Sequence, residues 1–214
     1  MSEHMALENL TVLDLTRVLA GPFCTMMLAD MGANVIKIEV PKGGDDTRSY
    51  PPFRAENLNG ERESVYFANI NRNKKGITLN LKAPEGKEIF KELVKKADIV
   101  VENYRPGVMD KLGLGYDVLK EINPRIIYAA VSGFGCYGPY HLRPGYDILA
   151  QAMGGMMSIT GSKGGEPTRA GSALGDILGG LHVTIGILAA VNARTITGKG
   201  QRVDVSLMDS MIAA

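Results

Sequence analysis

The alternation of short β-branched runs with helical segments is the feature that most restricts the fold of this chain. Residues 10–15 (LTVLDL) and 35–38 (VIKI) have the composition of buried strands. The segment between them has Pro22 at a suitable helix start, followed by the helix-forming sequence FCTMMLADM. Two strands joined in this way form a βαβ unit, which requires a parallel strand pair and a right-handed crossover.

The same pattern continues to the end of the chain. We expect further strands at residues 77–81, 99–101, 126–131 and 201–207, and further helices at 84–96, from about 177 to 194, and from 208 onwards. The polar segment 41–71 is expected to be a long, functional loop. We therefore predict an α/β fold with a Rossmann-like wound parallel sheet.

Composition limits the partners of the chain. Its 214 residues are 45% hydrophobic and carry a net charge of +1, which predicts one domain and disfavours general binding to nucleic acid or membrane. The apolar stretch 177–191 is interrupted by glycine, histidine and threonine, so we expect a buried helix rather than a membrane span. Two cysteines, Cys24 and Cys136, and an N-terminus without an apolar signal core favour a cytoplasmic location.

Two familiar motif types are disfavoured. Residues 133–138 (GFGCYG) match GxGxxG, but Pro139 and Pro144 follow, so a glycine-rich turn is favoured over a nicotinamide site. The three histidines, His4, His141 and His182, lack the spacing of metal ligands, and we predict no metal.

Asp176 stands among glycines immediately before a long apolar run, which places it near a helix N-terminus. As a helix N-cap it would have a purely structural role, and this interpretation is favoured by the residues alone. As a reactive group it would be kept ionised by the helix dipole, and Gly175, Gly179 and Gly180 would let a substrate approach the backbone. A carboxylate that attacks a thioester forms a mixed anhydride.

The basic segment 71–76 (NRNKKG) also has two interpretations. A solvated turn is favoured, and a phosphate clamp made by Arg72, Lys74 and Lys75 is the alternative.

Several segments in order resemble the family III CoA-transferases, which include formyl-CoA, carnitine and bile-acid CoA-transferases. They are LTVLDLTRVLAGPFCTMMLADMGANVIKIE, NRNKKGITLNLKAPEGKE, ADIVVENYRPGVMDKLGLGY, RPGYDILAQAMGG, GSALGDILGGLHVTIGILAAV and TGKGQRVDVSL. The resemblance implies that residues 8–214 form the N-terminal part of the family's large domain, truncated before the small domain. The ending MDSMIAA, which starts a helix without a C-cap, agrees with that expectation.

The resemblance also implies a reaction. Asp176, in the family's GD-x-x-x-G motif, resembles the nucleophile that takes the acyl group of an acyl-CoA and later carries CoA as an enzyme thioester. The expected partners are an acyl-CoA and a carboxylic acid, with CoA as substrate and no permanently bound cofactor. The longer protein is expected to be an interlocked homodimer.

The family's binding positions carry over to particular residues of this chain. Tyr146 and Asp147 resemble residues that border the active site. Leu19 replaces the glutamine of formyl-CoA transferase, which argues against oxalate and for a larger or less polar acyl group. The expected CoA contacts are Val18, Leu19, Arg48, Asn71, Arg72, Asn73, Lys74, Lys75, Asn103, Tyr104, Arg105 and Lys111.

Two alternatives stay open. The related α-methylacyl-CoA racemases use the histidine of a GHD motif, but this chain has Gly145-Tyr146-Asp147, and tyrosine is a poor base near neutral pH. The other alternative is an inactive CoA-binding module, because the family's glycine-rich covering loop lies beyond residue 214. We also expect the isolated chain to expose apolar surface and to be poorly stable.

Overall fold

A single parallel sheet forms the centre of the molecule. The computed structural model describes residues 4–56, 60 and 62–214. Its six strands are β1 (Thr11–Asp14), β2 (Asn34–Glu39), β3 (Lys75–Thr78), β4 (Ile99–Glu102), β5 (Ile127–Ser132) and β6 (Arg202–Ser206). They lie in the order β3-β2-β1-β4-β5-β6 and pair in parallel throughout, which confirms the predicted wound α/β fold.

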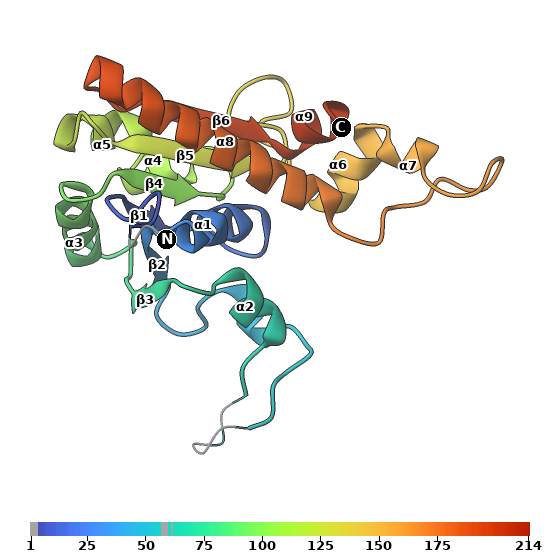
Figure 1. The fold of residues 1–214 in the computed structure, drawn as a ribbon, viewed down its shortest axis with the longest axis horizontal. Coiled ribbons are helices and arrows are strands. Elements are labelled where there is room, and N and C mark those ends of the chain that lie inside the picture. Colours follow the sequence, from blue (N-terminus) through green and yellow to red (C-terminus); the bar gives the residue numbers. More distant parts are fainter. Residues whose placement is uncertain (1–3, 57–59, 61) are drawn as a thin grey trace.

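Helices cover both faces of this sheet (Figure 1). α1 (Ala20–Asp30) and α8 (Leu174–Thr197) pack on one face, and α3 (Pro84–Val94), α4 (Val108–Leu112) and α5 (Tyr116–Ile122) pack on the other. Successive strand residues point to opposite faces, so Val12 joins the core under α1 and α8 while Leu13 joins the core under α3 to α5. Both faces are buried, as expected for a parallel sheet.

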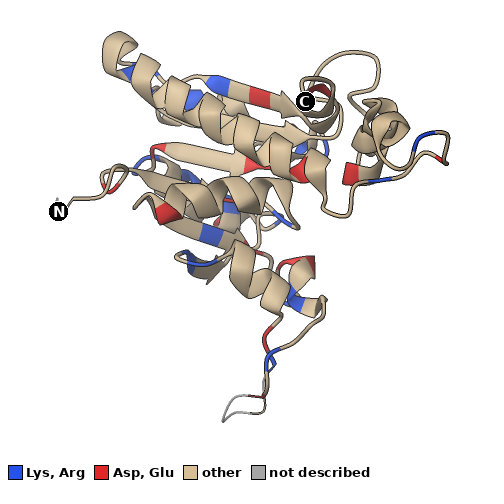
Figure 2. Cartoon of the chain, turned by 45° about the vertical axis from the view of Figure 1, so that its right-hand side comes forward, with Lys and Arg blue, Asp and Glu red and all other residues tan. Residues whose placement is uncertain are grey.

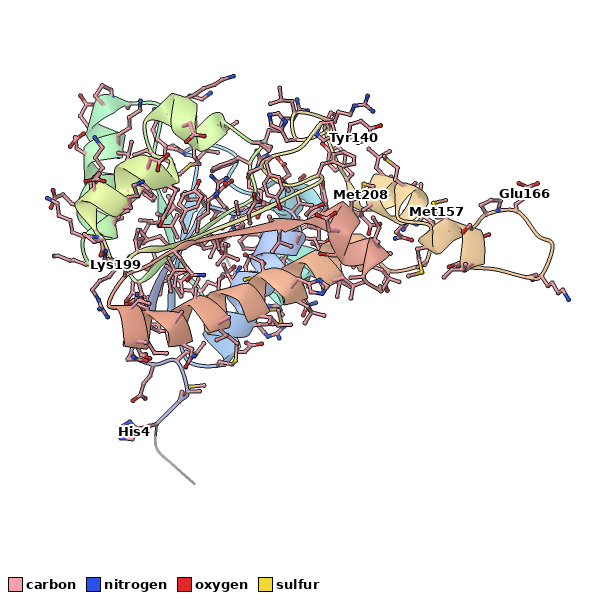
Figure 3. The ribbon with its side chains drawn as sticks, turned by 90° about the horizontal axis from the view of Figure 1, so that it is seen from above. His4, Tyr140, Met157, Glu166, Lys199 and Met208 are labelled. Carbon is pink, nitrogen blue, oxygen red and sulfur yellow. The ribbon has the colours of Figure 1, made fainter. Side chains whose placement is uncertain are left out.

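The remaining short elements lie beyond the carboxyl ends of the strands or at the edge of the sheet. α6 (Asp147–Met153), α7 (Met156–Ile159) and α9 (Leu207–Ile212) gather where β5 and β6 end, and α2 (Val65–Ile70) lies beside β3 (Figure 1). Figure 3 shows that the loop between α7 and α8, which contains Glu166, projects away from the sheet. Lys199 lies at the C-terminal end of α8, far from this loop.

The predicted strands and helices are present, but two predictions differ in detail and the helices α4 to α7 were not predicted. The strand expected at 77–81 lies earlier, as β3, because its pairing with β2 sets Lys75 opposite Ile36. The segment 41–71 is not all loop: it contains the 3-10 helix η1 (Asp46–Ser49) and α2. The side chains of Asp45 and Ser64 cap these helices by accepting the backbone N–H groups of Thr47 and Phe67.

α8 is long and apolar enough to cross a membrane by length and composition alone. In this structure it packs against α1, β5 and β6, and Val183, Ile187 and Ala190 are fully buried in the core. The segment 133–138 is a turn after β5, and the next helix begins only at Asp147, as the two prolines predicted.

Candidate active site

A cavity opens where the strand order reverses. β1 and β4 are neighbours, but their following connections run to opposite sides of the sheet, and ligands of such folds bind in the crevice beyond these strand ends. The cavity has a volume of about 380 Å³. It is lined by Arg17 to Ala20, Asp46, Asn103 to Pro106, Val108, Val131 to Gly133, Arg143 to Tyr146, Asp176 and Leu207.

Asp176 reaches this cavity from the first turn of α8. The helix begins after Ala173, whose own side chain makes no capping hydrogen bond, and Asp176 is the third residue inside the helix. The N-cap interpretation of Asp176 is therefore wrong, because the cap position lies three residues earlier. The side chain lines the cavity instead of closing the helix end.

Burial dominates the electrostatics of Asp176. Removal from water raises the pKa of its carboxyl group, and the charge of nearby Asp147 raises it further, to about 7. Burial and Asp147 therefore oppose the ionisation of Asp176 that the helix dipole favours. Near neutral pH, Asp176 exchanges readily between its acid and its nucleophilic carboxylate form.

Asp147 is tied directly to the start of α8. Its Oδ1 accepts the backbone N–H of Gly175 at 2.8 Å, and its Oδ2 accepts Nε2 of Gln151 at 2.8 Å. Gln151 is fully buried, and its Oε1 accepts the N–H of Ala170 at 2.9 Å. Figure 2 shows acidic positions where the beginnings of α6 and α8 come together. Gln151 was not predicted, although its spacing of four residues from Asp147 on a helix was a usable signal.

The loops after β1 and β4 bring five of the twelve expected CoA contacts to the same cavity. Val18, Leu19, Asn103, Tyr104 and Arg105 all line it, together with Tyr146. The Asn103 side chain bridges the two loops, since its Oδ1 accepts the N–H of Arg17 at 2.8 Å and its Nδ2 donates to the Arg17 carbonyl at 2.7 Å.

The segment Asn71 to Lys75 does not reach this cavity. Lys74 is buried, and its Nζ donates to Asp14 Oδ2, Asn71 Oδ1 and the Pro22 carbonyl at 2.9–3.0 Å. A phosphate clamp through Lys74 is therefore wrong, because all of its donors are used inside the fold. The solvated turn is wrong for Lys74 too. Arg72 and Asn73 bind Asp30, and Lys75 binds Asn34.

Two further expected contacts also lie outside the main cavity. The guanidinium of Arg48 binds the Glu39 carboxylate and lies 3.8 Å from the centre of the Phe67 ring. It borders a second, open hollow of about 520 Å³ together with Arg17 and residues 42–46. Lys111 is exposed on α4 and lines neither hollow.

The glycines of α8 serve helix packing. A Cβ on Gly179 would lie 2.5 Å from Leu207 Cδ2, and one on Gly180 would lie 2.7 Å from the Ala20 carbonyl oxygen. The expectation that Gly179 and Gly180 let a substrate approach the backbone is wrong, because α9 and α1 occupy that space. Gly175 is likewise covered by Ala150 and Asp147.

Arg105 was expected at this site from the sequence, whereas Arg143 and Tyr66 were not. Within the described residues, Arg105 and Arg143 line the cavity without a carboxylate partner. Arg143 lies 4.1 Å over the ring of Tyr140, which is labelled in Figure 3. Burial, and next the charge of Asp176, raise the pKa of Tyr66 in α2 to about 12. Guanidinium groups of this kind suit phosphate or carboxylate ligands.

Known proteins resemble this chain in sequence and in fold. A family model described as CoA-transferase family III matches residues 7–214. The acetyl-CoA:oxalate CoA-transferase of Acetobacter aceti is 50% identical over 96% of this chain and 52% of its own length. The succinyl-CoA:glutarate CoA-transferase of Homo sapiens is 47% identical over 100% of this chain and 48% of its own length.

A crystal structure of a CAIB/BAIF family protein from Brucella suis agrees with the fold. It superposes with a TM-score of 0.94 at 45% identity, covering 99% of this chain and 56% of that one. The chain thus spans about half the length of the curated relatives it matches.

Proposed function

This chain belongs to CoA-transferase family III, and we propose that it carries the nucleophile of a reaction that moves CoA from an acyl-CoA to a carboxylic acid. The observation that carries the proposal is the position of Asp176. Its carboxyl group lines the crevice at the reversal of the strand order, in the first turn of a helix, with Asp147 beside it. Family membership supports CoA thioesters as the substrates.

The first half of the proposed reaction loads CoA onto Asp176. A carboxylate oxygen of Asp176 bonds to the thioester carbonyl carbon, and the carbon–sulfur bond breaks with its electron pair left on the CoA thiolate. The thiolate then attacks the aspartyl carbonyl of this mixed anhydride. The donor acid leaves as a carboxylate, and Asp176 is left as a CoA thioester.

The second half repeats these steps with the acceptor. The acceptor carboxylate attacks the Asp176 thioester and expels the thiolate, giving a second mixed anhydride. The thiolate then attacks the acceptor's carbonyl carbon, which releases the new acyl-CoA and regenerates the Asp176 carboxylate. No proton is gained or lost over the cycle, so the reaction needs an ionised Asp176 and no general base.

The other residues of the cavity bind and position the substrates in this proposal. A volume of about 380 Å³ suits the acyl group and the thiol end of CoA, while the remainder of CoA extends outside it. Arg105 and Arg143 supply donors for phosphate or carboxylate groups. Arg48 and Arg17 border the neighbouring hollow, where each is paired with a carboxylate, Glu39 and Asp46 respectively.

The proposed class of acceptor acid rests on the names of two relatives and on one residue that lines the cavity. Oxalate and glutarate, in the names of the two relatives, support short dicarboxylic acids as acceptors. Leu19 lines the cavity with an apolar side chain, which supports an acid larger than oxalate. We therefore place four- to six-carbon dicarboxylic acids first in the acceptor panel.

Trapping tests the mechanism. The protein is incubated with a panel of acyl-CoAs and hydroxylamine, and the modified peptide is mapped by mass spectrometry. We expect a hydroxamate on Asp176, absent in Asp176→Asn and retained in the matched control Asp110→Asn, which changes an exposed aspartate of α4. CoA binding without any hydroxamate would support the binding module. Exchange of the α-proton of a branched acyl-CoA without transfer would support the racemase.

The proposal also covers the cellular location and the oligomeric state of the longer protein. Cys24 and Cys136 are both free thiols, which supports a reducing, cytoplasmic location. An interlocked homodimer stays a prediction of the family resemblance. Cell fractionation and sedimentation of the full-length protein test these two points separately.

A further inference from the structure

The loop between β1 and α1 is held by side chains from four different parts of the chain. The backbone N–H of Thr16 donates to Asp14 Oδ1 at 2.8 Å, and the Thr16 carbonyl accepts Lys37 Nζ at 2.9 Å. Asn103 binds both backbone groups of Arg17, and the N–H of Val18 donates to Asp45 Oδ1 at 3.3 Å. Three successive residues are thus fixed individually, at the wall of the cavity that contains Asp176.

Val18 is held in an unfavourable backbone conformation. Its φ is 69°, in the left-handed region that β-branched residues rarely adopt. Such a conformation persists only where the surrounding structure enforces it, and it is found mainly at functional sites. A glycine at this position would relieve the strain, yet the chain carries valine.

The groups that enforce this conformation form a buried ion pair. Lys37 Nζ lies 2.9 Å from Asp45 Oδ2, and the two side chains are 2% and 0% exposed. Burial works against an ionised Asp45, but the charge of Lys37 overcomes it and lowers the pKa of that carboxyl group. Asp45 Oδ1 also accepts the N–H and Oγ1 of Thr47, so the carboxylate cannot turn away from Val18.

Stability alone does not account for this pair. Buried ion pairs are weak contributors to stability, and apolar replacements of similar volume often serve as well. In this structure the pair also binds the backbone of the loop. Lys37 donates to the Thr16 carbonyl, and Asp45 accepts the Val18 N–H. The position of the pair behind the cavity wall indicates a role in shaping that wall.

We infer that Lys37 and Asp45 are positioning residues that keep the loop of residues 16–18 strained and preset for the CoA thioester. The inference rests on the proposed function. Neither side chain touches the substrate, and both act through the backbone of Thr16 and Val18. A preset loop loses no conformational freedom when the ligand binds, and this raises affinity without adding a contact.

Substitutions at Val18 separate strain from side-chain contact. Val18→Gly is expected to raise the melting temperature by about 2–4 °C because it removes the strain. The same change is expected to weaken binding of CoA, measured by calorimetry, by at least about fivefold because it loosens the loop. Val18→Ala trims the side chain but keeps a Cβ, so its loss of affinity should be clearly smaller than that of glycine.

Asp45→Asn is a second test of the positioning role. It keeps the shape of the side chain and removes the charge that binds Lys37, so CoA binding should weaken and KM for acyl-CoA should rise more than kcat falls. Phe90→Leu, a core change on the opposite face of the sheet, is the control for stability. It should lower the melting temperature and leave CoA affinity unchanged.

The outcomes distinguish this inference from the proposed function. If the unsubstituted protein binds no CoA, both are overturned. If it binds CoA and Val18→Gly melts lower, or binds CoA as tightly as the unsubstituted protein, only the positioning role is overturned. Loss of affinity in Phe90→Leu equal to that in Asp45→Asn would also overturn it, since a general loss of stability would then explain both.

Discussion

Asp176 must be ionised to attack a thioester, and two features of its surroundings oppose that state. Burial and the nearby Asp147 raise its pKa to about 7. We therefore expect the rate of hydroxamate formation to rise as the pH rises through 7. Asp147→Asn removes the second cause and should move this rise to lower pH. The rate is measured in single turnovers from pH 5.5 to 8.5, and an unmoved profile in Asp147→Asn would contradict the coupling of the two carboxyl groups.

The same shift predicts a stability cost for the nucleophile. The pKa of Asp176 is 3.8 in the unfolded reference and about 7 in the fold, so between these values the folded state binds more protons. The stabilising contribution is fully present below pH 3.8 and is lost as the pH rises through 7. Asp176→Asn has no such loss. Its melting temperature relative to the unsubstituted protein should therefore increase from pH 4.5 to pH 8, and an equal difference at both values would refute this explanation.

At the scale of single residues, the sequence indicated the positions of the site better than their roles. The family motif placed Asp176, Val18, Leu19 and Asn103 at one cavity, and the structure brings them there. Sequence reasoning failed where the environment is built by distant residues. Asp147 adds to the rise in the pKa of Asp176 from 29 positions away, and Lys74 binds Asp14 across 60 positions.

The contact between α1 and α8 depends on a glycine. Alanine at Gly180 would gain about 1 kcal/mol of helix propensity, but its Cβ would lie 2.7 Å from the backbone oxygen of Ala20. Backbone cannot move aside as a flexible side chain can, so we expect Gly180→Ala to destabilise the fold by roughly 1–3 kcal/mol. Gly171→Ala meets open space and is the matched control. Urea unfolding measures both, and equal midpoints would contradict this close packing.

Lys74, in the turn before β3, and Lys75, the first residue of β3, are expected to differ in their contribution to stability. Burial opposes the charge of Asp14, yet Lys74 and Lys37 lower its pKa to about 2. Lys74→Met leaves this carboxylate with one partner fewer, and we expect a loss of about 3–5 kcal/mol in the free energy of unfolding. Lys75→Met, at an exposed side chain bound only to Asn34, should change it by less than about 0.5 kcal/mol. Similar losses of unfolding free energy in both variants would show that Lys74 contributes no more to stability than an exposed lysine.

Elements were predictable where local sequence decides them. The strands β1, β2, β4 and β5 are buried apolar runs, and their positions followed from composition. η1 and α2 were missed because they are short and depend on caps and packing, with Asp45 bound by Lys37 of β2. The boundary of β3 was missed because all four of its residues are exposed and only its pairing with β2 defines it.

At the scale of the whole molecule, the sheet order gathers the site from distant segments. The loops after β1, β4 and β5 meet the first turn of α8 because their strands are neighbours with all carboxyl ends on one side. Parallel strand order could be expected from the βαβ pattern, but the neighbours of each strand could not be read from the sequence. The location of the cavity between β1 and β4 is therefore a result of the structure.

The outer surface of α8 carries exposed apolar side chains that affect the self-association of the isolated 214-residue chain. Leu181 and Ile185 lie four residues apart on its outer face, 37% and 62% exposed, and Ile196 is 82% exposed. Exposed apolar side chains that gather on one face promote association. We therefore expect residues 1–214 alone to self-associate with rising concentration in sedimentation velocity. The curated relatives are about twice as long, so a longer form has further chain available to cover this face.

A charge on this face should reverse the association. Ile185→Glu is expected to shift the chain toward monomer with little change in its melting temperature, because the side chain is 62% exposed. Lys96→Glu, at an exposed residue that follows α3 on the other face of the sheet, changes the net charge twice as much. If Lys96→Glu disperses the chain equally, net charge rather than the apolar face drives association. A chain that stays monomeric and melts cooperatively without either change would refute the expectation of poor stability.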